Sequence, residues 1–237
     1  ERLFGKRMTV LELHEIETGY GTGQVLFGVS LKITAGACVS LMGRNGMGKT
    51  TTVRAIMGQL PLNAGWICRF GRDNGNRSSF EIARAGIGLV PEGRQIFSNL
   101  TVRENLQTFY RMSDSKTCSG WHLDRVLALF PVLAERLDHA GNHLSGGEQQ
   151  MLAIGRALMT NPKLLILDEA TEGLAPIIRK QIWNCLNQLK QDGQSILIID
   201  KNVDAIARLA DHNYILDKGR VVWHGASTEL LTTPDLK

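Results

Sequence analysis

The run Leu41-Met42-Gly43-Arg44-Asn45-Gly46-Met47-Gly48-Lys49-Thr50-Thr51 has the spacing G-x-x-x-x-G-K-T. Glycines at this spacing let a backbone fold into a concave nest whose N–H groups point inward toward an anion. Lys49 would add a compact cation beside the β- and γ-phosphates of a nucleotide, and the Thr50 hydroxyl is suited to ligate Mg²⁺. The same letters also fit an ordinary glycine-rich turn, so the flanking sequence has to distinguish the two interpretations.

The flanks favour a phosphate-binding loop. Residues 37–42 form a short strand-like run before the loop, and residues 51–60 carry apolar side chains at helical spacing after it. A strand–loop–helix arrangement points the helix N-terminus, with its partial positive charge, at the phosphate site. The sequence therefore predicts that residues 43–51 hold a phosphate group.

The whole chain has the size and composition of one large α/β domain, or of a core with a smaller lobe. It has 237 residues, 43% of them hydrophobic, and its 27 basic and 23 acidic residues give a net charge of +4. This mild excess is spread along the chain and fits a solvated surface, so no nucleic-acid partner is inferred from it. The four cysteines form no C-x-x-C pair, which favours a reduced, cytosolic environment over disulfides or zinc.

The longest apolar runs, such as residues 164–167 and 196–199, are too short to cross a bilayer. We therefore expect any membrane role to be peripheral. No secretory signal is visible, and Met8 can be the true start, with residues 1–7 a leader or added sequence. Little sequence follows Gly225, which argues against a C-terminal regulatory domain.

The N-terminal part of the chain is predicted to form two half-buried strands. Residues 10–18 and 25–33 alternate apolar and polar side chains. The turn-rich loop between them carries one aromatic residue, Tyr20. Its ring suits stacking on an adenine and equally suits packing at a sheet edge. Position alone leaves both roles open.

A helical segment separates two strand-rich parts of the chain. Residues 87–90 are predicted to be a buried strand that runs into Glu92, and α/β proteins keep their ligands beside such strand ends. Thr101 and Glu104 make a capping box that begins a helical pattern. Residues 92–144 therefore look like a helical lobe inserted between two strand-rich segments.

A second anion site is suggested by the run Leu144-Ser145-Gly146-Gly147-Glu148-Gln149-Gln150. Ser145 and Glu148 form another capping box, which opens a helix with apolar side chains on one face. The plain structural interpretation is a well-capped helix start. The functional interpretation is an anion site in which free N–H groups, flexible glycines and a serine hydroxyl are presented together.

Two acids follow a run that fits a strand buried on both faces. Residues 164–167 are apolar and are followed by Asp168 and Glu169. Asp168 can hold Mg²⁺ through water, and Glu169 can polarise an attacking water. Either acid alone would be an ordinary solvated residue at a strand end. Together with the phosphate loop, the pair favours a site for nucleotide hydrolysis.

The remaining sequence continues the alternation of helices and strands. It predicts a helix at residues 177–190, a buried strand at 195–199 that ends at Asp200-Lys201-Asn202, a helix at 203–209, and a hairpin of residues 214–216 and 221–223.

Three motifs, in this order and around a helical insert, make the chain resemble the ATP-binding subunit of ABC transporters. They are the phosphate loop, LSGGEQQ and LLILDE, and the resemblance spans about residues 9–225. Within that family, VPEGRQIF, LTVRENL and DEATEGLAP are most similar to the LivF-type subunit of branched-chain amino acid importers. The resemblance implies an α/β fold with a RecA-like P-loop core, an N-terminal antiparallel β subdomain and an inserted helical subdomain. It implies a single ABC ATPase domain over residues 8–237, with the core at about 8–91 and 157–237 and the helical subdomain at about 92–156.

The function implied by the resemblance is that of a subunit that binds and hydrolyses ATP, with Mg²⁺, to power an importer for branched-chain amino acids. Such a subunit sits peripherally at the cytoplasmic face of the membrane. It pairs head to tail with a second ABC ATPase subunit, identical or different, and binds transmembrane permease subunits, which an extracytoplasmic solute-binding protein serves.

Three alternatives stay open. The chain can be a nucleotide-gated regulatory subunit with weak hydrolysis, the ATPase of an importer for urea or short amides, or the ATPase of an exporter. A soluble ABC ATPase acting on nucleic acid or the ribosome is disfavoured, because such proteins usually carry two nucleotide domains in one chain or long coiled-coil inserts.

The resemblance also implies a role for each matching residue. Those expected to contact nucleotide are Tyr20 on the adenine, Gly43, Asn45, Gly46, Gly48, Lys49, Thr50 and Thr51 in the phosphate loop, and Ser145, Gly146 and Gly147 toward the ATP held by the partner subunit. Those expected to hold Mg²⁺ are Thr50, Asp168 and Glu92, and those expected to act in catalysis are Glu169, Lys201 and Glu92.

Three positions depart from the usual family pattern. Glu92 stands where most members have glutamine, Lys201 where most have a histidine, and Ala175 where an aspartate is usual. A lysine, with an unperturbed pKa of about 10.4, does not shuttle a proton near neutral pH. Lys201 and Ala175 motivate the regulatory alternative, whereas Glu169 argues for hydrolysis.

Overall fold

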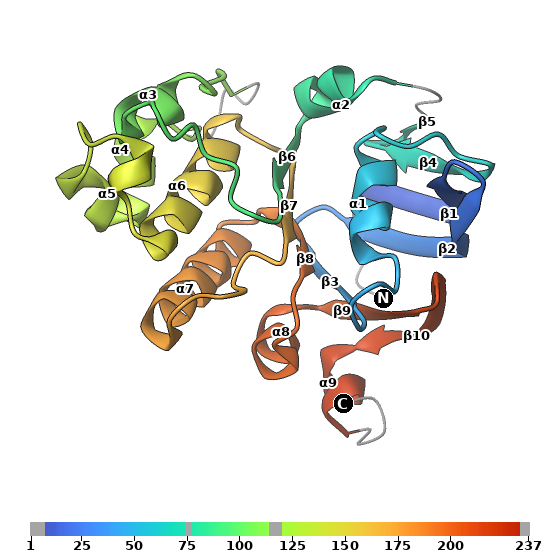
Figure 1. The fold of residues 1–237 in the computed structure, drawn as a ribbon. Coiled ribbons are helices and arrows are strands. Elements are labelled where there is room, and N and C mark those ends of the chain that lie inside the picture. The colour runs from blue at the N-terminus through green and yellow to red at the C-terminus, as the bar shows by residue number, and fades with distance from the viewer. Residues whose placement is uncertain (1–7, 74–76, 114–119, 233–237) are drawn as a thin grey trace, which may run out of the picture.

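The computed structural model describes residues 8–73, 77–113 and 120–232, and the expected leader at residues 1–7 lies outside the described residues. The strands form two sheets with helices around them (Figure 1). The strands are β1 (Thr9–Tyr20), β2 (Gly23–Thr34), β3 (Cys38–Met42), β4 (Ala64–Arg69), β5 (Arg72–Asp73), β6 (Ile87–Val90), β7 (Leu164–Asp168), β8 (Ser195–Ile199), β9 (His212–Asp217) and β10 (Arg220–Ala226). The helices are α1 (Lys49–Ile56), α2 (Ser79–Ala85), α3 (Val102–Gln107), α4 (Leu123–Leu129), α5 (Pro131–Glu135), the 3-10 helix η1 (Gly141–His143), α6 (Gly146–Met159), α7 (Pro176–Gln191), α8 (Val203–Leu209) and α9 (Ser227–Thr232).

The larger sheet has the strand order β10-β9-β3-β8-β7-β6. Its strands are parallel from β9 to β6, and β10 pairs antiparallel with β9. Strand β7 is buried along its whole length, with Leu164 and Ile166 in one apolar cluster and Leu165 and Leu167 in the other. Because both faces are covered, the strand carries the continuous apolar run that the sequence shows.

The smaller sheet is antiparallel, with the order β2-β1-β4-β5, and packs with α1 on one face of the larger sheet. Strands β1 and β2 alternate buried and more exposed side chains, as their sequence pattern predicts. Their pairing continues to Tyr20 opposite Gly23, so Tyr20 is the last residue of a strand. The expectation of a longer loop around this residue is therefore corrected.

The other face of the larger sheet is covered by helices, with α3, α4, α5 and α6 forming the inserted lobe at the left of Figure 1. The predicted capping box of α3 is present, because Thr101 Oγ1 accepts the Glu104 N–H at 3.2 Å and Glu104 Oε2 accepts the Thr101 N–H at 2.8 Å. Helix α6 runs on to Met159, past the predicted limit of the helical subdomain near residue 156. The division into core and helical subdomain stays a prediction.

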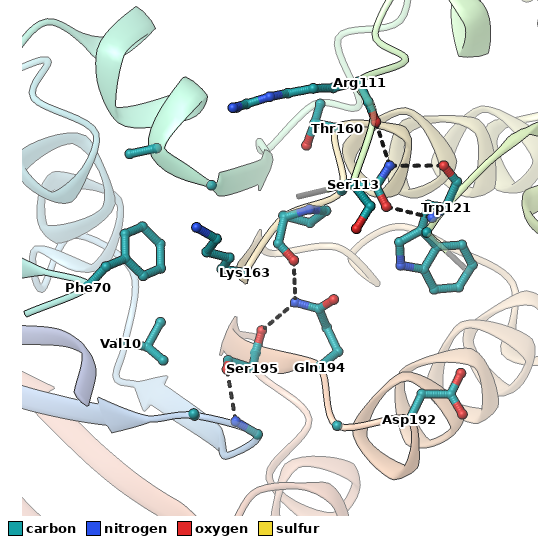
Figure 2. Close-up of a pocket in the computed structure, with 18 of the residues that line it drawn as sticks. Val10, Phe70, Arg111, Ser113, Trp121, Thr160, Lys163, Asp192, Gln194 and Ser195 are labelled. Atoms are coloured by element: carbon teal, nitrogen blue, oxygen red, sulfur yellow. Dashed lines mark hydrogen bonds between the residues drawn. The ribbon is translucent and has the colours of Figure 1, made fainter. Parts of the chain in front are cut away.

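Side-chain hydrogen bonds to the backbone tie together the loops at the N-terminal edge of the parallel strands (Figure 2). Asn161 Nδ2 donates to the carbonyl oxygens of Arg111 at 2.6 Å and Trp121 at 3.0 Å. Gln194 Nε2 donates to the Pro162 carbonyl oxygen at 3.1 Å. These loops surround a cavity of about 750 Å³ whose lining includes no residue of the three motifs. The phosphate loop and the Asp168-Glu169 pair lie at the opposite edge, where β3 and β7 end.

Cysteines and helix lengths complete this description. Cys38, Cys68 and Cys185 are free thiols, and Cys118 lies outside the described residues. None of the helices in the described ranges combines the length and hydrophobicity that crossing a bilayer requires.

Candidate nucleotide-binding site

The phosphate loop joins β3 to α1 and depends on three glycines with positive φ. Gly43, Gly46 and Gly48 have φ values of +146°, +79° and +104°. A Cβ on Gly43 would lie 2.3 Å from the Leu216 carbonyl oxygen, so only glycine fits between the loop and β9. Gly48 is the N-cap of α1, and the unpaired N–H groups of the first helical turn therefore open toward the loop.

Lys49 is folded over this loop. Its Nζ donates to the carbonyl oxygens of Gly43 at 2.9 Å and Arg44 at 3.0 Å, and lies 3.6 Å from Glu169 Oε1. The Lys49 side chain is only 4% exposed. The ammonium group therefore already lies over the loop, and phosphate oxygens would replace these carbonyl acceptors when a nucleotide binds.

A cavity of about 280 Å³ brings the phosphate loop together with acids from two other loops. It is lined by Val25, Asn45, Gly46, Gly48, Lys49, Thr50, Thr51, Glu92 and Glu169. Three stretches that are distant in the sequence thus meet at the carboxyl edge of the sheet, as α/β folds place their ligands. The N–H groups and the lysine suit a phosphate tail.

Thr50, Glu92 and Asp168 meet in an adjoining cavity of about 480 Å³. Thr50 hydrogen-bonds the Asp168 carboxylate, while Asp168 Oδ1 is buried and has no hydrogen-bond partner among the described residues. Burial raises the pKa of Asp168, and the nearby Glu92 raises it further. An unpaired buried carboxylate oxygen beside a hydroxyl and a second acid fits the oxygen ligands that Mg²⁺ prefers. Within the described ranges no three His, Cys, Asp or Glu side chains gather to hold a metal alone, so phosphate oxygens and water would complete the shell.

Glu169 follows β7 directly and has a φ of +52°. Its N–H donates to the Ile199 carbonyl oxygen at 2.8 Å, and its side chain, 11% exposed, lies 3.6 Å from Lys49 Nζ and 3.7 Å from Lys201 Nζ. Burial and, after it, the neighbouring Glu172 raise the pKa of Glu169 to about 7, against the opposing effect of the two lysines. A carboxyl group that titrates near neutrality suits a general base.

Glu172 was not among the predicted site residues, although it contacts both Glu169 and Lys201 at this edge of the sheet. Its Oε1 lies 2.5 Å from Lys201 Nζ, and its carboxyl group is within hydrogen-bonding reach of that of Glu169. The sequence carried no local signal for this contact, because Glu172 and Lys201 are 29 positions apart and belong to turns after different strands.

Tyr20 stands beside the first turn of α1. Its hydroxyl accepts a hydrogen bond from Arg54 Nη1 at 3.0 Å and lies 3.5 Å from Thr51 Oγ1. The side chain is 44% exposed. An exposed ring next to the phosphate loop is compatible with stacking on a base.

The LSGGEQQ stretch lies apart from the phosphate loop of its own chain. Ser145 is the N-cap of α6, with its Oγ accepting the Glu148 N–H at 3.3 Å and its N–H donating to Glu148 Oε2 at 2.7 Å. Residues 145–147 line neither cavity described above, and α6 and α1 lie on opposite sides of the central strands in Figure 1. Ser145, Gly146 and Gly147 are therefore not brought to the loop within one chain.

The profile of the ABC transporter family matches residues 26–172, from β2 to the turn after β7. The chain belongs to the ABC transporter family. This match joins the phosphate loop, the helical insert and the LSGGEQQ stretch in one unit, and the chain is an ATP-binding subunit of that family.

Relatives of this ABC subunit include proteins named for amino acid transport and for lipopolysaccharide export. It is 42% identical over 228 residues to the high-affinity branched-chain amino acid transport ATP-binding protein BraG of Pseudomonas aeruginosa, covering 96% of this chain and 97% of the relative. It is 34% identical over 232 residues to the lipopolysaccharide export system ATP-binding protein LptB of Escherichia coli, covering 97% and 96%.

Solved ABC cassettes share the fold. A nucleotide-free ATP-binding cassette from an ABC transporter superposes with a TM-score of 0.83 and 28% identity, over 97% of both chains. A dimeric cassette in a post-hydrolysis state bound to ADP and phosphate gives a TM-score of 0.78 and 25% identity, over 92% of this chain and 99% of that one. The expected ABC ATPase fold is confirmed, and the chain is an ABC ATPase that binds ATP and hydrolyses it for transport.

Proposed function

We propose that this chain is the ATP-hydrolysing subunit of an importer for branched-chain amino acids. The hydrolytic role is carried by one observation, the placement of Glu169 between Lys49 and Lys201 at the edge of the phosphate-loop cavity. The cargo is supported by the 42% identity to BraG along almost the whole of both chains, which exceeds the 34% identity to LptB.

The residues of the site divide the work by position. We assign the phosphates to the N–H groups of the loop and to Lys49, and the adenine to the exposed ring of Tyr20. Glu169 orients the attacking water and accepts its proton on a carboxylate oxygen, while Lys201 supplies positive charge beside it. Mg²⁺ bound by Thr50, Asp168 and Glu92 would neutralise charge on the phosphates.

A second subunit is proposed to complete each site. Ser145, Gly146 and Gly147 lie away from the phosphate loop of their own chain, so the N–H groups of the two glycines and the Ser145 hydroxyl are available to ATP held by a partner in a head-to-tail pair. Homologous cassettes form dimers. We place the pair peripherally at the cytoplasmic face of the membrane, bound to permease subunits that an extracytoplasmic solute-binding protein serves.

A regulatory subunit with weak hydrolysis is the second candidate. The ion pair between Lys201 and Glu172 favours it, because a lysine held by a carboxylate cannot relay a proton as a histidine does. Such a subunit would bind ATP and close on its partner while the partner hydrolyses.

The test is ATP hydrolysis by the complex with its membrane subunits in proteoliposomes that contain the solute-binding protein. We expect leucine, isoleucine or valine to stimulate turnover, and Glu169→Gln to lower kcat by at least about a hundredfold. Urea and acetamide are tested in the same assay, because an importer for urea or short amides is the alternative. Stimulation by urea instead of leucine would contradict the cargo, and full turnover with Glu169→Gln would favour the regulatory subunit.

A further inference from the structure

A buried hydrogen bond locks the turn after β7 to the turn after β8. Thr171 Oγ1 and Asp200 Oδ2 are 2.5 Å apart, and both side chains are buried. Asp200 Oδ1 also accepts the Asn202 N–H at 3.0 Å. Glu172 and Lys201 each follow a member of this bond, so the two backbones hold them next to each other.

Lys201 lies between two carboxylates. Its Nζ is 2.5 Å from Glu172 Oε1 and 3.7 Å from Glu169 Oε2. Glu172 makes the shorter contact, so we take it to hold the Lys201 ammonium group in place. Glu169 is the neighbour beside which that group is then held.

Lys201 also borders a cavity beside the phosphate loop. Lys201 lines a cavity of about 560 Å³ together with Gly43, Arg44 and Asn45. A lysine stem has four rotatable carbons and would sample this space if it were not held. Glu172 lines none of the three cavities around the loop.

Stability is a poor explanation for this ion pair. The side chains of Lys201 and Glu172 are 42% and 49% exposed, and exposed ion pairs contribute little to the free energy of unfolding. The ion pair instead restricts the position of the Lys201 ammonium group, beside the point where Glu169 lines the phosphate-loop cavity.

We propose that Glu172 is a positioning residue for ATP hydrolysis, which holds Lys201 Nζ beside Glu169 at the edge of the phosphate-loop cavity. The proposal rests on the roles given above to Glu169 and Lys201. Lys201 supplies the charge, and Glu172 acts in this role through Lys201.

The experiment is a double-mutant cycle on ATP hydrolysis by the complex with its membrane subunits. Glu172→Gln and Lys201→Gln are each expected to lower kcat by about tenfold, because a misplaced charge loses transition-state stabilisation, with the KM for ATP nearly unchanged. The double variant should be no slower than the slower single variant, since Lys201→Gln already removes the cation that Glu172 would hold. Glu172→Asp, which keeps the carboxylate, should restore part of the rate.

Glu12→Gln is the matched control, because Glu12 forms an exposed ion pair with Lys32 at 3.1 Å in the antiparallel sheet. Its kcat should equal that of the wild type. A wild-type or raised kcat for Glu172→Gln, or independent losses that multiply in the double variant, would overturn the positioning role. Glu169→Gln distinguishes a failure of the proposed hydrolytic function from a failure of the positioning role. Turnover that survives Glu169→Gln refutes the hydrolytic function itself. Loss of turnover in Glu169→Gln, together with full activity of Glu172→Gln, refutes only the positioning role.

Discussion

At Glu169 the backbone turns with a φ of +52° directly after β7, and the side chain reaches back between two lysines. Non-glycine residues adopt such angles rarely, and functional sites are where they concentrate. The turn is held by the hydrogen bond from the Glu169 N–H to Ile199 on β8. The position of the carboxylate therefore depends on two neighbouring strands.

Titration of Glu169 should appear in the pH dependence of stability. Burial, followed by Glu172, raises the pKa of Glu169 from 4.5 to about 7, so between these values the folded state keeps a proton that the unfolded state releases. This stabilisation is fully present below pH 4.5 and is lost as the pH rises through 7. In Mg²⁺- and nucleotide-free buffer, the Tm of Glu169→Gln relative to wild type should rise from about pH 5 to about pH 8. Parallel Tm curves would contradict the raised pKa.

Buried strands and capped helix starts were the features that the sequence predicted best. The predicted strand at residues 195–199 and helix at 203–209 coincide with β8 and α8, and all seven residues of α8 follow the Asn202 N-cap. Helix α1 begins at Lys49 rather than at residue 51 and ends at Ile56 rather than at residue 60, because Gly58 leaves the helical region with a φ of +66°. Local periodicity indicates that a helix exists, while its ends depend on individual dihedral angles.

Two matched caps separate stability from function. Ser145→Ala and Thr101→Ala each remove a capping box, and each should cost about 1 kcal/mol of stability, or roughly 2–4 °C in Tm. Only Ser145→Ala should lower ATP turnover by the complex, because only Ser145 belongs to the proposed partner-facing stretch. Equal losses of turnover in both variants would assign the effect to stability and remove support for that stretch.

Contacts between distant segments were beyond the reach of sequence reasoning. Glu172 and Lys201 are 29 positions apart, and nothing local to either shows that the strands before them are neighbours in the sheet. The same holds for Gly43, whose lack of a side chain is required by the Leu216 carbonyl group on β9. The motifs identified the chemistry of the site, and the strand order decided which of their residues meet.

On the scale of the whole molecule, the phosphate loop contacts the β9–β10 hairpin, which in turn contacts β2. The tip of the β9–β10 hairpin reaches it, with the Gly219 N–H donating to the Met47 carbonyl oxygen at 3.1 Å and the Lys218 N–H lying 3.2 Å from Met47 S. The Phe27 N–H on β2 donates in turn to the Gly219 carbonyl oxygen at 2.9 Å. Nucleotide affinity should therefore respond to changes in this distant hairpin.

Gly219→Ala tests that response. Gly219 has a φ of +75°, and a Cβ there would lie 1.9 Å from the Val25 carbonyl oxygen, so the hairpin tip has to move. We expect a loss of roughly 2–3 kcal/mol of stability and weaker ATP binding. Gly193→Ala is the control, because its φ of +83° carries the same strain with nothing within 4 Å. Measured Tm and ATP affinity that fall equally in both variants would limit the effect to backbone strain.

The hairpin contact also has a consequence for biosynthesis. Ribosomes release a protein from its N-terminus onward, and Met47 leaves the exit tunnel long before Gly219 has been translated. On the nascent chain, the phosphate loop therefore lacks the hairpin tip that contacts it in the finished protein. A partly translated polypeptide would carry the nucleotide motif without this contact, and its affinity for ATP would reach the final value only after Gly219 has left the exit tunnel.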